Sequence, residues 1–150
     1  MKINLKIIIL LFTIFIGGCS STKISSKERN FRLNKIHDFY SNWKGTKYKY
    51  GGMNKHGVDC SGLMVLLYSH EFHKKIPRTT KTIAKFGKEV DLNELEVGDL
   101  ILFKINWSTR HVGVYIGNKK FIHSSRRKGV TISTLDQFWI NKFWQGRRVL

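Results

Sequence analysis

Three side chains of this 150-residue sequence, Cys60, His111 and His123, have the residue types of a thiol-based acyl-transfer site. Cys60 lies in the stretch "GVDCSG", directly ahead of the apolar run "LMVLLY", so we predict that it begins a helix. A cysteine attacks as a thiolate, and the positive end of a helix dipole favours that form by lowering the thiol pKa. Asp59 is a good N-cap for such a helix. Free N–H groups in the first turn can donate to an oxyanion.

The two histidines fall in the segment "HVGVYIGNKKFIHSS", which has the pattern of a β-hairpin that turns near Asn118. In that hairpin His111 and His123 come opposite or nearly opposite each other. A cross-strand pair of histidines suits a general base and the residue that orients it. The other four histidines are weaker candidates: His37, His70 and His73 lie among charged residues on helical stretches, and His56 lies in a loop.

Two simpler interpretations of these residues stay open. Each histidine, taken alone, reads as a strand residue whose ring nitrogens are satisfied by backbone groups. Cys60, His111 and His123 are also three conceivable zinc ligands, but the sequence has no second close ligand pair such as CxxC. We therefore predict nucleophilic catalysis by Cys60 that needs no metal and no other cofactor.

The elements that must position these residues indicate an α+β fold. Residues 31–43 and 60–72 have helical apolar patterns, and the second is apolar around most of its circumference, which indicates a buried helix. Gly62, in the first turn of that helix, favours a close approach to a neighbouring sheet. Residues 100–104 and the hairpin read as strands, and "GVTIST" and "GRRVL" are further strand candidates. Helices first and adjacent strands later favour an antiparallel sheet.

The face of the first hairpin strand that carries His111 also carries Gly113, Tyr115 and Gly117. We expect the open space beside these glycines to receive the helix end that starts at Cys60. Two shorter elements complete the prediction: a turn and short helix in "IPRTTKTIAKFG", and a short helix or loop in "DQFWINKFW".

The first residues form a separate unit. Lys2 and Lys6 precede the apolar run "IIILLFTIFI", and small residues follow it, which is the pattern of a signal peptide. A short membrane helix is the alternative, but a spanning helix needs about 20 apolar residues. The stretch "IGGC" resembles the lipobox of bacterial lipoproteins, which implies a diacylglycerol thioether on Cys19. The predicted divisions are a signal peptide at 1–18, the lipidated cysteine with a polar tether at 19–30, and a catalytic domain at 31–150.

Charge and cysteine content narrow the function classes. The formal net charge of +17 favours polyanions such as cell-wall polymers, anionic lipids or nucleic acid, although codon bias in an AT-rich genome explains such a charge equally well. No nucleic-acid-binding motif is present, and export argues against that class. The sequence has two cysteines. With Cys19 lipidated, Cys60 is a lone thiol in an exported protein, which calls for a chemical role.

Five segments together resemble the NlpC/P60 cysteine peptidases over about residues 43–150: "GTKYKYGGMNKHGVDCSGLMVLLY", "IPRTTKTIAKFGKEV", "VGDLILF", "HVGVYIGNKKFIHSS" and "GVTIST". The resemblance implies a papain-like core, in which the helix that bears the nucleophile packs on an antiparallel sheet. It also implies a cysteine endopeptidase of the cell wall. Such an enzyme hydrolyses peptide bonds in peptidoglycan stem peptides or cross-links, often beside a D-amino acid or diaminopimelate.

The resemblance also assigns roles to individual residues. It makes Cys60 the nucleophile, His111 the proton acceptor and His123 the orienting residue of a Cys-His-His triad. Tyr48 matches a family tyrosine beside the active site that helps the oxyanion. Ser61 matches a residue at the substrate edge.

Some positions are less clear or depart from the family pattern. Asp59 matches the motif as structural support and as a second candidate for substrate contact, and Arg78 stays open between those two roles. Val97 stands where a proline is common before "GDL". The stretch "KINWSTR" lacks the family's frequent small residues, which affects the expected substrate and not the mechanism.

Other functions of the same chain stay open: a related thiol amidase or acyltransferase, and a catalytically silent wall-binding lipoprotein. The expected partners are peptidoglycan and, through the lipid on Cys19, a membrane. No nucleic acid and no obligate protein partner are expected. The expected location is the cell envelope. Ser20 replaces the aspartate associated with inner-membrane retention, which favours the periplasmic face of the outer membrane in a cell that has one.

Overall fold

The computed structural model describes residues 23–150, so the predicted signal peptide and Cys19 lie outside the described residues. None of the helices within residues 23–150 combines the length and the apolar character that crossing a membrane requires. The described chain contains these helices: α2 (Ser26–Trp43), α3 (Cys60–Phe72), α4 (Thr80–Ile83), the 3₁₀-helix η2 (Leu92–Glu94) and α5 (Gln137–Lys142). Its strands are β1 (Met53–Asn54), β2 (Gly57–Val58), β3 (Lys88–Val90), β4 (Leu100–Lys104), β5 (Arg110–Gly117), β6 (Lys120–Ser125), β7 (Gly129–Thr134) and β8 (Phe143–Arg148).

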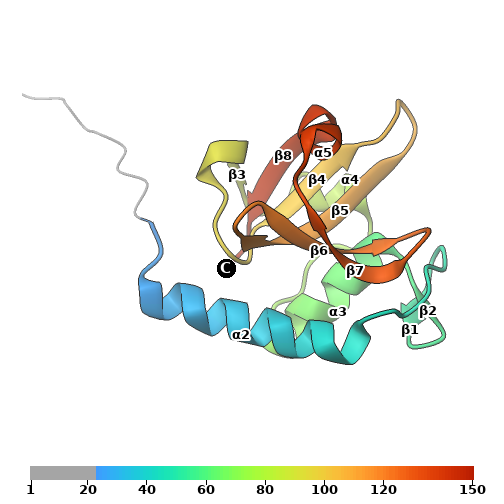
Figure 1. Ribbon diagram of the computed structural model, residues 1–150, viewed down its shortest axis with the longest axis horizontal. Helices are drawn as coiled ribbons and strands as arrows, with labels where there is room; N and C mark the ends of the chain where they lie inside the picture. Colours follow the sequence, from blue (N-terminus) through green and yellow to red (C-terminus); the bar gives the residue numbers. More distant parts are fainter. Residues whose placement is uncertain (1–22) are drawn as a thin grey trace, which may run out of the picture.

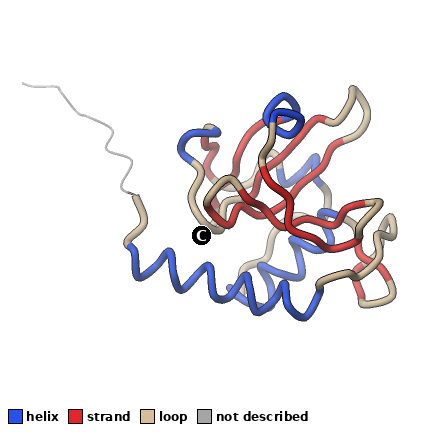
Figure 2. The backbone as a smooth tube through the Cα atoms, in the orientation of Figure 1, coloured by secondary structure: helices blue, strands red, loops and turns tan. Residues whose placement is uncertain are grey.

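The predicted α+β architecture is confirmed. Six strands form one antiparallel sheet in the order β3-β8-β4-β5-β6-β7, and β1 and β2 form a small separate ribbon. Figure 1 shows α2 and α3 lying together on one side of this sheet, while α5 lies beyond its other side. Figure 2 shows the same arrangement by element type, with the long helices on one side of the strands.

The core lies between α3 and the sheet. Leu63, Met64 and Leu67 of α3 are buried in one cluster with Val112 and Val114 of β5. On the other face of the sheet a smaller cluster contains Ile101, Phe103, Phe121 and Leu135, with Trp139 of α5 packed against it. Successive residues of a strand point to opposite faces, and this alternation divides the apolar residues of β4 between the two clusters. Burial on both faces fixes the register of the sheet that carries the histidines.

Two element boundaries differ from the prediction. Helix α2 begins at Ser26, five residues before the expected start, because the Ser25 hydroxyl accepts from the Glu28 N–H and caps the helix. Residues 26–30, which the sequence places in the tether, are therefore helical. The final strand begins at Phe143, and it lies between β3 and β4 inside the sheet.

Candidate active site

Cys60 is the first residue of α3, as predicted. The carboxylate of Asp59 caps this helix by accepting from the Gly62 N–H at 2.6 Å, and the Asp59 carbonyl accepts from Leu63 at 3.0 Å. Capping by Asp59 explains why the helix starts at this residue and no later. Cys60 is 7% exposed, so its thiol lies at the floor of the site and not on the open surface.

The Asp59 carboxylate is held on both oxygens. Arg78 donates to Oδ1 at 2.9 Å and to Oδ2 at 2.8 Å, and the Gly51 N–H donates to Oδ2 at 2.8 Å. Burial raises the pKa of this carboxyl, but its bonds from Arg78 and from the N–H groups of Gly62 and Gly51 bring the pKa below its usual value. Arg78 also donates to the Ser61 hydroxyl at 2.9 Å. Asp59 and Arg78 therefore form an ion pair next to the nucleophile. This contact gives Arg78 a structural role.

Gly62 permits a close approach, but to a loop and not to the sheet that the sequence suggested. A Cβ atom at this position would lie 2.6 Å from the carbonyl oxygen of Gly52 and 3.0 Å from Oδ1 of Asp59. The loop that precedes β1 thus lies directly against the first turn of α3. This contact draws Tyr48 toward the start of the helix, because the same loop carries both residues.

The thiol of Cys60 has three polar neighbours. The Thr80 hydroxyl lies 3.9 Å from Sγ, and the backbone groups of Val112 and Ser61 are near enough to the sulfur to lower the thiol pKa. Burial nevertheless raises the pKa of the thiol, and these neighbours offset only part of that rise. The sequence-based expectation of a lowered thiol pKa is wrong, because removal from water outweighs the helix dipole.

A chain of hydrogen bonds connects the two histidines across neighbouring strands. His111 Nε2 lies 2.8 Å from His123 Nδ1, and His123 Nε2 lies 2.8 Å from the hydroxyl of Ser133. The predicted contact between the histidines is thus confirmed, and it continues through β6 into β7. The sequence analysis missed Ser133, since only the pairing of His123 with Thr131 brings the hydroxyl within reach.

The histidines are diagonal neighbours rather than directly opposite. Val114 pairs with Ile122 and Gly117 with Lys120, so the hairpin turns at Asn118 and Lys119, and the register at Val114 lies two residues from the expected one. His123 then lies beside Gly113, where a Cβ atom would come within 3.3 Å of the His123 Cβ. Diagonal partners remain within reach of long side chains, which is why the pair still forms.

The space beside Gly113 does not receive the end of α3, contrary to the prediction. A side chain at Gly113 would meet Phe121 and His123, while Trp139 of α5 lies 5.7 Å from the His111 ring and 5.3 Å from the His123 ring. The imidazole pair therefore sits in an aromatic setting on the face away from α3. Cys60 approaches it from the other side of β5, next to the Val112 backbone.

Both imidazoles are neutral at physiological pH. Burial lowers the pKa of His111 to about 3, helped by His123 and the positive Arg126, and burial with the nearby Lys128 lowers that of His123 to about 4. With His111 Nε2 bonded to His123, its Nδ1 is the nitrogen left for a substrate or thiol proton. For that role Nε2 must carry the hydrogen, so His123 accepts at Nδ1 and donates from Nε2 to Ser133.

Cys60 and His111 line a common cleft with two lobes. One lobe, a cavity of about 480 Å³, contains the polar residues around Asp59, Arg78 and Thr80, and the other, about 360 Å³, contains both histidines. Five residues border both lobes: Tyr48, Cys60, Thr109, Arg110 and Arg126. Within residues 23–150, no hydrogen bond joins the thiol to His111.

Tyr48 stands at the junction of the lobes. The Arg126 guanidinium lies 5.6 Å from the centre of its ring. Burial and then the charge of the nearby Cys60 thiolate raise the pKa of the Tyr48 hydroxyl, so it stays protonated as a hydrogen-bond donor. This position is compatible with the oxyanion role that the resemblance implies.

The remaining histidines lie elsewhere. His37, His70 and His73 are exposed on or beside α2 and α3, in agreement with their interpretation as surface residues, and His56 is exposed in the turn between β1 and β2. In the part of the chain that the structure describes, no three His, Cys, Asp or Glu side chains are arranged to hold a metal ion.

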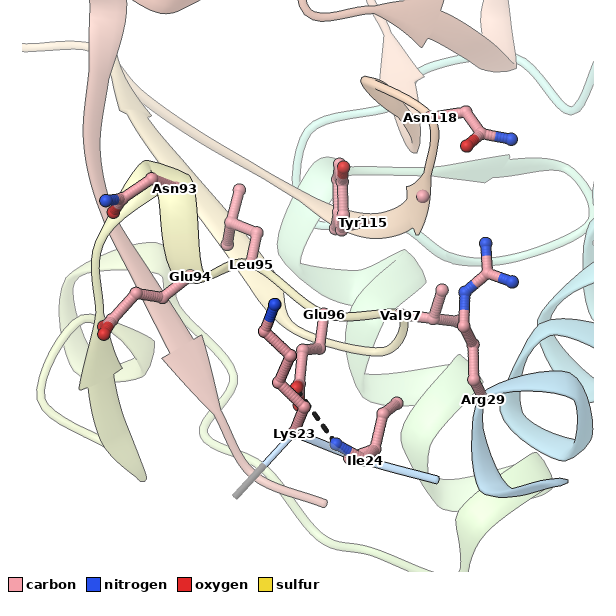
Figure 3. A pocket seen from close by; sticks show the side chains of 11 residues that line it. Lys23, Ile24, Arg29, Asn93, Glu94, Leu95, Glu96, Val97, Tyr115 and Asn118 are labelled. Carbon is pink, nitrogen blue, oxygen red and sulfur yellow. Dashed lines mark hydrogen bonds between the residues drawn. The ribbon is translucent and has the colours of Figure 1, made fainter. Parts of the chain in front are cut away.

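A separate cavity of about 370 Å³ lies between the start of α2 and the β5–β6 turn (Figure 3). Its walls include Arg29, Glu96 and Tyr115, and the Glu96 carboxylate accepts from the Ile24 N–H at 3.0 Å. None of the residues that line it borders the cleft around Cys60, and none is a cysteine or a histidine. This cavity therefore contains no candidate nucleophile.

Comparison with known proteins agrees with the geometry. The chain is 40% identical over 152 residues to the probable endopeptidase NlpC of Escherichia coli, covering 95% of this chain and 97% of that one. It is 41% identical over 117 residues to the E. coli murein DD-endopeptidase MepS/murein LD-carboxypeptidase, covering 77% of this chain and 62% of that protein.

Solved structures give the same result. An NlpC/P60 family protein from Bacillus cereus superposes with a TM-score of 0.70 at 29% identity, over 77% of this chain and 39% of that one. The model of the NlpC/P60 family matches residues 45–148, a range that contains the capped cysteine, both histidines and Ser133. The chain therefore belongs to the NlpC/P60 family.

Proposed function

We propose that this protein is a cysteine endopeptidase that hydrolyses peptide bonds in peptidoglycan stem peptides or cross-links. The observation that carries the proposal is the common cleft: a helix-capped thiol and a hydrogen-bonded histidine pair border one cavity. Relatives named as murein endopeptidases support the choice of substrate. Cys60 is the nucleophile, His111 the base and His123 the orienting residue.

Acylation begins from the neutral pair. A bound peptide displaces water from the cleft, and the Cys60 thiol transfers its proton to Nδ1 of His111 as sulfur attacks the carbonyl carbon. The imidazolium that forms on His111 donates from Nε2 to His123, which passes the polarisation to Ser133. His111 then gives the proton to the leaving amine, and a thioester on Cys60 remains.

The oxyanion of the tetrahedral intermediate forms beside the start of α3. The Asp59 side chain occupies the Gly62 N–H, so the earlier N–H groups of the first turn are the available donors. The protonated Tyr48 hydroxyl supplies a further donor from the opposite wall of the cleft. Ser61, fixed by Arg78, borders the polar lobe in which one side of the substrate lies.

Deacylation reverses these roles. His111 takes a proton from water, hydroxide adds to the thioester carbonyl, and the thiolate leaves and recovers its proton. A transfer to an amine in place of water makes the same cleft an acyltransferase. Hydrolysis is the proposed outcome because the relatives are named as peptidases.

The location of the enzyme follows from its first residues. Cys19 carries a lipid anchor after removal of residues 1–18, and the domain is held at the cell envelope, on the outer membrane in a cell that has one. Cys19→Ala should incorporate no labelled palmitate and should leave an uncleaved or soluble protein with unchanged peptidase activity. Labelled, membrane-bound Cys19→Ala protein would contradict the anchor.

Digestion of purified peptidoglycan, followed by mass analysis of the fragments, tests the function. Wild-type protein should release peptides with new amino and carboxyl ends, and Cys60→Ser should release none while keeping the wild-type fold. Fragments in which an amide is exchanged for another amine would indicate the acyltransferase alternative. A wild-type protein that binds the wall without cleaving it would identify a silent binding module.

A further inference from the structure

Two arginines, Arg110 and Arg126, border both lobes of the cleft, as Cys60 does. Arg110 is the first residue of β5, and Arg126 follows β6 in the turn toward β7. Each lines the polar lobe and the histidine lobe, together with Cys60. Their guanidinium groups are therefore placed where a substrate crosses from one lobe to the other, next to the bond that is cleaved.

Neither arginine has an acidic partner. Within residues 23–150, the arginines that form ion pairs are Arg32, Arg78, Arg147 and Arg148. Arg110 and Arg126 form none with the described residues. Among the described residues that line the cleft, Asp59 is the one acid, and Arg78 neutralises it through two hydrogen bonds. The cleft therefore holds uncompensated positive charge beside the thiol.

Aromatic rings hold both guanidinium groups in place. Arg126 lies 5.6 Å from the ring centre of Tyr48, and Arg110 lies 5.6 Å from that of Trp144. Stacking on a ring leaves the N–H groups at the edge of a guanidinium free, and these form a planar fork that matches a carboxylate. An arginine held in this way loses less conformational entropy on binding than a free side chain does.

We infer that Arg110 and Arg126 form a subsite for a free carboxylate on a substrate residue that flanks the scissile bond. The inference rests on the proposed function, and it adds a substrate requirement to it: a peptide that bears this carboxylate is cleaved well, and its carboxamide is cleaved poorly. A carboxamide keeps the shape and loses the charge, so the discrimination comes from the two arginines.

The experiment compares soluble stem peptides in which each free carboxyl group is replaced in turn by a carboxamide. We expect one replacement to lower the wild-type kcat/KM by about 10- to 100-fold, the loss typical of one charge-assisted hydrogen-bonded contact. In Arg126→Gln, and in Arg110→Gln, that ratio should fall to within about threefold of one. Arg126→Lys should restore part of the ratio, because it keeps the charge without the fork.

Lys88→Gln is the matched control, since it removes one positive charge from the edge strand β3, away from the cleft, and should leave the ratio unchanged. The inference is overturned when the wild type cleaves every peptide equally, or when both arginine variants keep the full ratio. Failure to cleave any peptide refutes the proposed function instead. The dissociation constants of the same peptides for Cys60→Ser then decide the carboxylate subsite, which requires weaker binding of one amidated peptide.

Discussion

Replacing Ser133 by alanine removes the last hydroxyl of the chain that runs from His111 through His123. The hydroxyl lies 2.8 Å from His123 Nε2, and His123 is only 3% exposed, so water cannot easily take its place. The substitution leaves a buried N–H without an acceptor. It also removes the acceptor that stabilises the tautomer of His123 with its hydrogen on Nε2.

The magnitude follows from these two losses. A buried donor without a partner lowers the free energy of unfolding by about 1–3 kcal/mol. A neutral hydrogen bond has a net value of about 1 kcal/mol, which corresponds to about a fivefold preference for one tautomer. In the other tautomer His123 donates to His111 Nε2, and Nδ1 of His111 can no longer accept the thiol proton. We therefore expect kcat to fall about two- to fivefold, the smaller loss applying when the two tautomers are otherwise equal in free energy. KM should be unchanged because Ser133 does not line the cleft.

The assay measures kcat and KM on a soluble stem peptide, together with urea unfolding, for three variants. Ser133→Ala should show both losses, and Ser133→Thr should recover most of kcat because it keeps a hydroxyl. Thr134→Ala removes the exposed neighbouring hydroxyl and should match the wild type. A Ser133→Ala protein with wild-type kcat, or a threonine variant as slow as the alanine variant, would refute the reasoning.

Three further predictions concern the same site. His111→Gln should lower kcat on the order of 10³-fold, and His123→Gln should retain at least tenfold more activity, since His111 moves the proton and His123 orients it; equal losses measured at equal melting temperature would contradict the division of roles. Because the pKa values of His111 and His123 are held at about 3 and 4, the unfolded chain binds protons that the folded state excludes. The free energy of unfolding should therefore be highest above about pH 6.5 and should fall toward pH 4, by up to about 1.4 kcal/mol per pH unit for each histidine. Urea titrations at several pH values should show that the free energy of unfolding depends less steeply on pH in His123→Gln than in the wild type. Equal pH dependence in the two proteins would exclude burial of a neutral His123. Gly62→Ala should destabilise the fold by about 1–3 kcal/mol, because its Cβ meets the Gly52 carbonyl; an unchanged melting temperature would show that the loop yields freely.

The local sequence pattern was sufficient to predict the elements that carry Cys60, His111 and His123. The capped start of α3 at Cys60 and the hairpin that joins the histidines depend on turn and capping residues close in sequence. The register of that hairpin differed by two residues because the chain turns at Asn118 and Lys119, later than expected, and an irregularity before Gly117 then shifts the pairing back by one residue. The histidine side chains are still in contact, since residues placed diagonally across two strands remain close enough for long side chains to touch.

Properties that depend on tertiary burial could not be predicted. The predicted decrease of the Cys60 thiol pKa was wrong, because the sequence indicates the helix dipole but not how far the thiol is removed from water. The role of Ser133 required the pairing of β6 with β7, which no short motif encodes. The partnership of Arg78 with Asp59 likewise connects residues 19 positions apart and became clear only from their contacts.

The position of β8 has a consequence for the biosynthesis of the protein. Residues 143–148 form the strand that separates β3 from β4, although all other strands of the sheet precede it in the chain. Until these residues leave the ribosome, β3 has no neighbour and one edge of β4 is unpaired, which is a template for aggregation with other chains. In a nascent chain, Cys60 is therefore synthesised well before the sheet that carries His111 is complete. Synthesis of β8 therefore completes the sheet and protects the chain from misassembly.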